Sequence, residues 1–282
     1  MNKLFQPVQV GSLTLKNSIV FAPTSVGREG LDFYEKIAKG GASLIILPDI
    51  SVIPSMLGAP SLGSLQYADY FRKVVEICHQ YDCKVSVQLF HPEYDVDYIG
   101  SLYRQRGKIS SDEVHRLLAE NMMGYADTLT KEQADAIVEK FAAAARNARE
   151  VGVDMIQIHG DRLIGSFSSA LFNHRTDRYA PHTAFAEAVV KAVRAAVPEM
   201  PLDYKLTIRT EEPKLGRGGA LISEVPEFVE VLEAAGVDAF HVAIAHHSNI
   251  RDTIPAANHP LLQGDGCFTH PGRTVPTMPR QH

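Results

Sequence analysis

Residues 151–159 read Val-Gly-Val-Asp-Met-Ile-Gln-Ile-His, and together with the residues before them they indicate an α/β fold. Upstream, Thr130 and Gln133 have the spacing of a capping box, and apolar residues follow at helical spacing until Gly152, a residue type that favours the end of a helix. The apolar run Met155–His159 follows at once and suits a strand buried on both faces. The stretch therefore predicts a helix, a glycine stop and a buried strand in direct succession.

The same unit recurs near residue 236. There Ala-Gly-Val-Asp repeats Val-Gly-Val-Asp, after a second helical pattern that opens at Ser223. Six apolar runs bounded by Gly or Pro are predicted strands: Ile19–Pro23, Ala42–Leu47, Lys84–Phe90, Met155–His159, Leu202–Arg209 and Phe240–Ala245. Repeated βα units predict either a parallel barrel or a doubly wound sheet. Because no GxGxxG or GxxxxGK[ST] motif follows a strand, the barrel is favoured.

The length of the chain sharpens this prediction. A (β/α)8 barrel typically takes about 250 residues, so 282 residues suit one barrel, yet only six strands are counted where eight are needed. We therefore expect an α/β fold of the TIM (β/α)8 type, incomplete at its C-terminal end, with about six of eight βα units. Residues 1–257 are expected to form the barrel, with an insertion at about 92–129 that covers the site, and residues 258–282 a divergent tail rich in Pro and His.

Composition narrows the class of partner. With 45% hydrophobic residues the chain has the material for a packed core, and a net charge of −5 gives no reason to expect nucleic acid or a membrane surface as a partner. Three cysteines without CxxC spacing disfavour a disulfide framework and a metal site. No apolar run of membrane-spanning length and no secretion signal is found, so we expect a cytoplasmic protein that acts on a small molecule.

Four motifs occur in a fixed order along residues 1–250. They are LFQPVQVGSLTLKNSIVFAP, VSVQLFH, DMIQIHG and FNHRTDRY. Together they resemble the old yellow enzyme family of FMN-dependent ene-reductases. The resemblance implies FMN bound over the C-terminal ends of the barrel strands, reduced by a nicotinamide or another reductant, and passing a hydride to an activated double bond.

The resemblance also implies positions that bind the cofactor. Pro23, Thr24 and Ser25 match the segment after the first strand that lines the flavin, although a plain strand-end turn is the alternative. Gln88 matches the amide that binds the pyrimidine edge of the flavin. Lys205 stands where the family has an arginine that stabilises negative charge at N1 of the reduced flavin, with a solvent-facing lysine as the alternative.

The end of the fourth strand departs from the family. Relatives place a His or Asn three residues after the histidine and then a proton-donating Tyr, whereas this chain has Arg162 and Ile164 after His159. This His-Gly-Asp-Arg stretch resembles the bilirubin reductase subgroup. A guanidinium binds carboxylates in a bidentate manner, which suits an anionic substrate. We therefore expect His159 and Arg162 to stabilise charge and Asp161, or a water that it holds, to deliver a proton; a surface ion pair of Asp161 and Arg162 is the alternative.

Three functions follow from these observations. The first is an FMN-dependent reductase that passes hydride to the conjugated C=C bridges of a tetrapyrrole, converting bilirubin to urobilinogen. The second is an ene-reductase for unsaturated carboxylates or acyl thioesters, favoured if Arg162 only grips a carboxylate. The third is an inactive fragment or pseudo-enzyme, because the strands that hold the FMN phosphate in the family are not found in the sequence.

Overall fold

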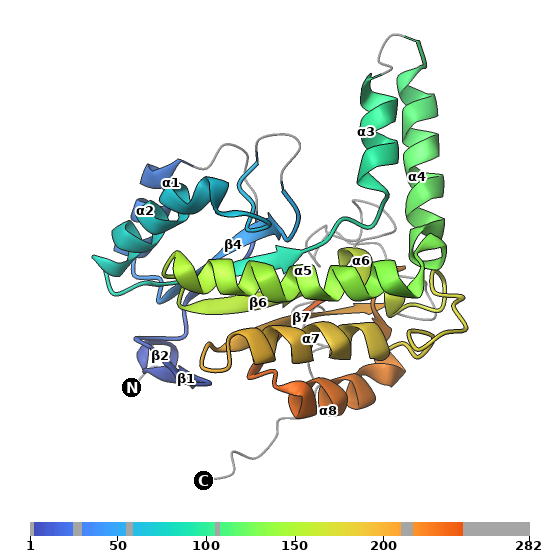
Figure 1. Ribbon diagram of the computed structural model, residues 1–282. Coiled ribbons are helices and arrows are strands. Elements are labelled where there is room, and N and C mark those ends of the chain that lie inside the picture. The colour runs from blue at the N-terminus through green and yellow to red at the C-terminus, as the bar shows by residue number, and fades with distance from the viewer. Residues whose placement is uncertain (1–2, 25–29, 55–58, 105–107, 210–216, 245–282) are drawn as a thin grey trace, which may run out of the picture.

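The computed structural model describes residues 3–24, 30–54, 59–104, 108–209 and 217–244. In these residues a curled parallel sheet is covered on its outer side by helices (Figure 1). The strands are β1 Val8–Val10, β2 Leu13–Leu15, β3 Val20–Phe21, β4 Leu44–Ser51, β5 Lys84–Phe90, β6 Met155–His159, β7 Leu202–Arg209, β8 Ala220–Leu221 and β9 Ala239–Ile244. The helices are α1 Leu31–Lys39, α2 Ala68–His79, α3 Val96–Arg104, α4 Ser111–Thr128, α5 Lys131–Glu150, α6 Arg162–Phe167, α7 Ala184–Ala196 and α8 Val225–Ala235.

The sheet confirms the predicted barrel-type fold. Its strand order is β3-β4-β5-β6-β7, and both β8 and β9 pair with β7 in parallel. All six predicted apolar runs form strands of this sheet, and the first is the shortest, with only two residues in β3. The sequence did not predict the short strand β8. Residues 258–282 lie outside the described part of the chain, so the division of the chain at residue 257 stays a prediction.

The helix signals were read correctly in the main. Thr130 and Gln133 form the predicted capping box at the start of α5, and Gly236 ends α8 with a φ of 114°, a left-handed conformation that favours glycine. The prediction that Ser223 opens the second helix was wrong by two residues. Ser223 lies in a 3₁₀ turn over Ile222–Glu224, and α8 begins at Val225 with a proline in its first turn.

The amino-terminal end of the sheet is closed by a hairpin that the sequence analysis did not predict. Strands β1 and β2 pair antiparallel, and Leu15 packs with the sheet residues Leu44, Ile46 and Met155 in a buried cluster. Apolar side chains thus fill this end of the barrel. The carboxyl ends of the strands, at the opposite end, carry the polar side chains described below.

Between β5 and α5 the chain forms a hairpin of two helices, α3 and α4, that rises away from the body of the molecule (Figure 1). It accounts for most of the predicted insertion at 92–129. Its foot is fastened by Arg175, whose Nη1 donates to the carbonyl oxygens of Ala126 and Leu129 while its guanidinium pairs with Asp177. This arrangement supports a structural role for the FNHRTDRY motif. Among the helices of the described residues, none combines the length and apolar character needed to cross a bilayer.

Candidate functional site

The predicted site residues lie at the carboxyl ends of adjacent strands. His159 is the last residue of β6 and stands in register with Lys205 of β7, and Gln88 of β5 stands in register with Gln157 of β6. The two strands β6 and β7 approach closely just beyond this point. A Cβ at Gly160 would lie 2.4 Å from the Lys205 carbonyl oxygen, so this position requires glycine.

A cluster of charged groups joins three strand ends, and we name it the Arg162 cluster: Asp49, Glu93, His159 and Arg162. The guanidinium of Arg162 lies 3.3 Å from Asp49 Oδ2 through Nη2 and 3.4 Å from Glu93 Oε1 through Nη1. His159 Nε2 lies 3.5 Å from Asp49 Oδ1. Asp49 therefore bridges His159 and Arg162, the two residues that the sequence predicts to stabilise charge.

Backbone strain marks both ends of the central ion pair. Asp49 has a φ of 47° and Arg162 a φ of 56°, which places both in the left-handed region. Asp49 sits in a register shift of the β4–β5 pairing, between Leu47 and Ile50. A left-handed conformation costs a residue with a Cβ about 1–2 kcal/mol, and such strain gathers at functional sites. The positions of Asp49 and Arg162 are therefore maintained against a local cost.

The electrostatics of the cluster follow from its partners. Burial opposes ionisation of Asp49, but the hydrogen bond from His159 and the charges of Arg162 and Lys205 hold the pKa of Asp49 at about 2. Burial lowers the pKa of His159, and the carboxylates of Asp49 and Asp161 oppose that change. For Arg162, burial is outweighed by Glu93, Asp49 and Asp161, which raise its pKa. Asp49 is thus an anion and Arg162 a cation at neutral pH.

Lys205 supplies a second cation beside the cluster. Burial lowers its pKa, and the carboxylates of Asp161, Asp49 and Asp203 oppose this. The Lys205 ammonium makes no hydrogen bond and has no carboxylate oxygen within 4.0 Å among residues 3–24, 30–54, 59–104, 108–209 and 217–244. A half-buried cation without a close partner in this part of the chain can meet an anionic group of a ligand.

Asp161 directly precedes helix α6. Its backbone N–H faces His159 Nδ1 at 3.4 Å, and a Cβ at Gly165 would lie 3.2 Å from its Oδ1. The Asp161 side chain is buried, so one of its oxygens is directed into the helix rather than toward solvent. The structure thus brings Asp161 close to His159 and Arg162, and the role of Asp161 in proton delivery stays a prediction.

Gln88 belongs to a row of polar side chains inside the barrel, which we name the interior polar row: Gln88, Gln157, Asp203 and His241. Gln88 Nε2 donates to Gln157 Oε1 at 2.6 Å, and Gln157 Nε2 donates to Asp203 Oδ2 and faces His241 Nδ1 at 3.3 Å. Burial raises the pKa of Asp203 to about 7, against the hydrogen bond from Gln157. Burial and the charge of Lys205 lower the pKa of His241 to about 4.

Pro23, Thr24 and His91 follow strands β3 and β5. Pro23 and Thr24 follow β3, half-buried and exposed respectively, and Ser25 lies outside the described residues. His91, the last residue of the VSVQLFH motif, is buried, with Nδ1 2.9 Å from the Pro92 carbonyl oxygen. Its own carbonyl accepts from Leu163 N at 3.4 Å, which fits a structural link between β5 and α6.

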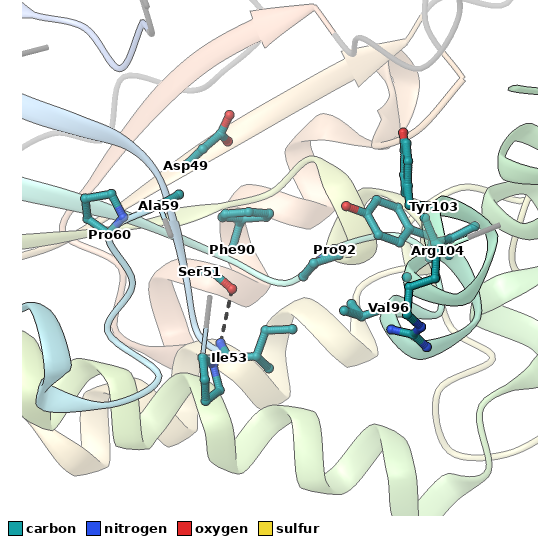
Figure 2. Close-up of a pocket in the computed structure, with 14 residues that line it drawn as sticks. Asp49, Ser51, Ile53, Ala59, Pro60, Phe90, Pro92, Val96, Tyr103 and Arg104 are labelled. Atoms are coloured by element: carbon teal, nitrogen blue, oxygen red, sulfur yellow. Dashed lines mark hydrogen bonds between the residues drawn. The ribbon is translucent and has the colours of Figure 1, made fainter. Parts of the chain in front are cut away.

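A cavity of about 470 Å³ opens beside Asp49, between the ends of β4 and β5 and helix α3. Figure 2 shows Val96, Tyr103 and Arg104 together on the side of α3, with Phe90 and Pro92 beside them toward the strand ends. Apolar and aromatic groups make up most of its lining, while Asp49 and Arg104 are its charged members. Part of the predicted insertion therefore lines a cavity that adjoins the Arg162 cluster.

Sequence reasoning missed several residues of the site. Asp49, Glu93, Gln157, Asp203 and His241 were not predicted as site residues. A signal for two of them existed, because Gln157 and Asp203 interrupt apolar runs that otherwise read as buried strand. A polar residue in such a run must find a hydrogen-bond partner inside the fold.

The polar groups at the carboxyl ends of the strands fit a flavin. Lys205 offers a cation without a close partner in the described residues, and Gln88 offers a buried amide oxygen that accepts only one long contact there, from Asp49 N at 3.4 Å. A reduced flavin carries negative charge and has a ring edge with donors and acceptors. The residues present can therefore hold such a ring at this edge.

Known proteins of one family are similar to this chain. The model of the NADH:flavin oxidoreductase / NADH oxidase family matches residues 3–275. The chain is 40% identical over 277 residues to a bilirubin reductase of Clostridium symbiosum, covering 94% of this chain and 74% of that protein. It is 39% identical to a bilirubin reductase of Mediterraneibacter gnavus, over 90% of this chain and 41% of that protein, so it spans well under half of the latter relative. A cinnamate reductase of Clostridium sporogenes is 28% identical, over 94% of this chain and 44% of that protein.

Solved structures show the same fold. A 2-naphthoyl-CoA reductase complex superimposes with a TM-score of 0.69 over 87% of this chain and 41% of that chain, at 19% identity. The old yellow enzyme of Pichia gives 0.59 over 72% of this chain and 60% of that chain, at 23% identity. On the family match, the 40% identity and the shared barrel, the chain belongs to the NADH:flavin oxidoreductase / NADH oxidase family, the old yellow enzyme family of flavin-dependent oxidoreductases.

Proposed function

We propose that this protein is an FMN-dependent reductase that passes hydride to the conjugated C=C bridges of a tetrapyrrole, with bilirubin as the substrate and urobilinogen as the product. The observation that carries the proposal is the 40% identity to a bilirubin reductase over 94% of this chain. The site adds a physical reason. A cation, Arg162, is positioned at the carboxyl edge of the sheet beside a largely apolar cavity, and bilirubin combines propionates with an extended apolar ring system.

FMN, when bound and reduced by a nicotinamide or another reductant, supplies the hydride. The residues of this chain hold it in our proposal. Lys205 stabilises negative charge on the ring, Gln88 accepts a hydrogen bond from its pyrimidine edge, and the backbone at Pro23, Thr24 and Ser25 lines it. The family match and the donor set of the edge support these roles.

Arg162 and His159 bind the substrate in this proposal. The two contacts of Arg162, at 3.3 and 3.4 Å, are longer than the typical 2.7–2.9 Å of a charge-assisted hydrogen bond, and its side chain is 40% exposed. The guanidinium is therefore held in place but not saturated, and a propionate can share it. His159 Nε2 can donate to a lactam carbonyl as negative charge develops there.

The insertion shapes the room for a long substrate. Helix α3 contributes Val96, Ile99, Tyr103 and Arg104 to the cavity. Aromatic and apolar walls favour a flat conjugated ligand, and Arg104 offers a second cation for a second propionate. We propose that one half of the tetrapyrrole enters this cavity while the other half lies over the Arg162 cluster.

Anaerobic reduction of bilirubin by the purified protein tests the proposal. The wild-type protein, loaded with FMN and supplied with NADH or dithionite, is expected to bleach the bilirubin absorbance. Arg162→Ala is expected to lose this turnover while retaining bound FMN, because the propionate loses its anchor. Arg162→Lys, which keeps the charge but not the planar fork, is the matched control and is expected to keep part of the activity. Equal turnover by the alanine variant and the wild type would refute the role of Arg162.

Reduction of an unsaturated carboxylate is the second candidate. It is favoured by the cinnamate reductase relative, 28% identical over 94% of this chain. Competition under the same anaerobic conditions separates the two functions. Rapid reduction of cinnamate with no loss of bilirubin absorbance would favour the second candidate. Protein that stays colourless after addition of FMN would favour the third reading, an inactive relative.

A further inference from the structure

We propose that Asp203 and His241 are positioning residues that act through Gln157 to fix the direction of the Gln88 amide, so that Gln88 presents its oxygen, and not its nitrogen, at the carboxyl end of the sheet. This inference rests on the proposed flavin site and names the residues that tune its contact with the ring. The hydrogen bonds of the interior polar row link Asp203 and His241 to Gln88 through Gln157.

Asp203 and His241 set the orientation of the Gln157 amide. Gln157 Nε2 lies within hydrogen-bond distance of Asp203 Oδ2 and 3.3 Å from His241 Nδ1. An amide nitrogen carries two hydrogens and can donate to both of these atoms, whereas the amide oxygen can donate to neither. His241 is uncharged at neutral pH because burial and Lys205 lower its pKa to about 4, and its Nδ1 accepts in the tautomer that carries the ring proton on Nε2. The ionised form of Asp203 and this tautomer of His241 therefore both require nitrogen at this position.

The fixed Gln157 amide then fixes Gln88. With its nitrogen turned toward Asp203 and His241, Gln157 turns its Oε1 toward β5, where Gln88 Nε2 donates to it at 2.6 Å. This leaves Gln88 Oε1 on the side of Asp49, whose backbone N–H lies 3.4 Å away. A carbonyl oxygen has two lone pairs and this one contact is long, so the oxygen can accept a further donor.

The chemical consequence is a site with a defined polarity. Gln88 is 1% exposed and offers an acceptor to whatever binds at the edge, so it selects a ligand with a donor there. The imide N–H of a flavin pyrimidine ring is such a donor. A reversed amide would present its N–H₂ group to the same atom and would leave two donors facing each other.

The composition of the row argues against a purely structural role. Asp203 is 5% exposed and Gln157 is fully buried, and burial of a carboxyl group is costly even when it is hydrogen-bonded. Apolar side chains of similar volume at these two positions would pack in the barrel without that cost. Orientation of a buried amide is a property that apolar side chains cannot provide.

Binding of FMN labelled with ¹⁵N at N3 tests the inference. The dissociation constant is measured by flavin fluorescence and the N3–H proton by NMR, for the wild type, Asp203→Ala, Gln157→Leu and Asp203→Asn. Loss of the fixed hydrogen bond is expected to raise the FMN dissociation constant about tenfold in Asp203→Ala and Gln157→Leu. In the same two variants the N3–H resonance is expected to move upfield and exchange faster with water. Asp203→Asn keeps an acceptor oxygen and is expected to stay within about threefold of the wild type.

The measurements distinguish a failure of the inference from a failure of the proposed flavin site. Wild-type affinity and an unchanged N3–H resonance in the alanine and leucine variants would overturn the inference while leaving the flavin site intact. Weaker binding with an unmoved N3–H resonance would also overturn it, because a loss of packing alone gives that pattern. A wild-type protein that binds no FMN would overturn the proposed function and the inference together. If Asp203→Ala does not fold, Gln157→Leu decides between these outcomes.

Discussion

The buried carboxyl group of Asp203 makes a quantitative prediction about stability. Burial raises its pKa from an ordinary value of 3.8 to about 7. The native state therefore binds more protons than the unfolded state between these values, and the free energy of unfolding falls as pH rises through this window. At about 1.4 kcal/mol for each pH unit, the full penalty above pH 7 is about 4 kcal/mol. Below about pH 4 the penalty is absent, because the carboxyl group is protonated in both states.

Asp203→Asn removes the titration and keeps the acceptor oxygen. Relative to the wild type, this variant is expected to gain about 2–3 kcal/mol in free energy of unfolding between about pH 5 and pH 8, because only the wild type must ionise a buried group. The measurement is urea unfolding followed by circular dichroism at several pH values. Asp69→Asn, which removes a carboxylate 90% exposed on α2, is the matched control and is expected to show no comparable change with pH. Parallel pH profiles for Asp203→Asn and the wild type would contradict a raised pKa of Asp203 in the native state.

Three further predictions concern the strand ends. Arg162→Gly is expected to be about 1 kcal/mol more stable than Arg162→Ala in urea unfolding, because glycine adopts a φ of 56° without strain; equal stability would contradict the left-handed conformation. Gly160→Ala is expected to lower the unfolding free energy by about 1–3 kcal/mol, because its Cβ would meet the Lys205 carbonyl oxygen at 2.4 Å; an unchanged urea midpoint would argue against this close approach. Glu93→Gln is expected to lower the KM for an anionic substrate about two- to fivefold, since one of the two carboxyl groups that share Arg162 loses its charge; steady-state kinetics that show a raised KM would mean that Glu93 chiefly positions the guanidinium.

The sheet was predictable because its signals are local. Buried parallel strands have near-continuous apolar runs, and glycine stops such as Gly152 and Gly236 mark the helix ends before them. The short strand β8 and the hairpin of β1 and β2 were missed because their few residues carry no periodicity of their own. Helices α3 and α4 lay within a segment that the sequence analysis treated only as an insertion.

The site was predicted in part, and the contacts that were missed join residues far apart in the chain. His159, Arg162, Gln88 and Lys205 stand at recognisable motif positions, and the structure brings them to one edge. The ion pair of Arg162 with Asp49 joins residues 113 positions apart in the chain. It depends on a bulge in β4 that no local sequence pattern predicts. Such pairs become visible only when the register of the strands is known.

The anaerobic loss of bilirubin absorbance, catalysed by the purified, FMN-loaded protein with an added reductant, decides whether this protein is a tetrapyrrole reductase. We expect turnover that requires both the bound flavin and Arg162, with urobilinogen as the product. A protein that binds FMN and accepts electrons but leaves bilirubin unchanged would contradict the proposal of a tetrapyrrole reductase.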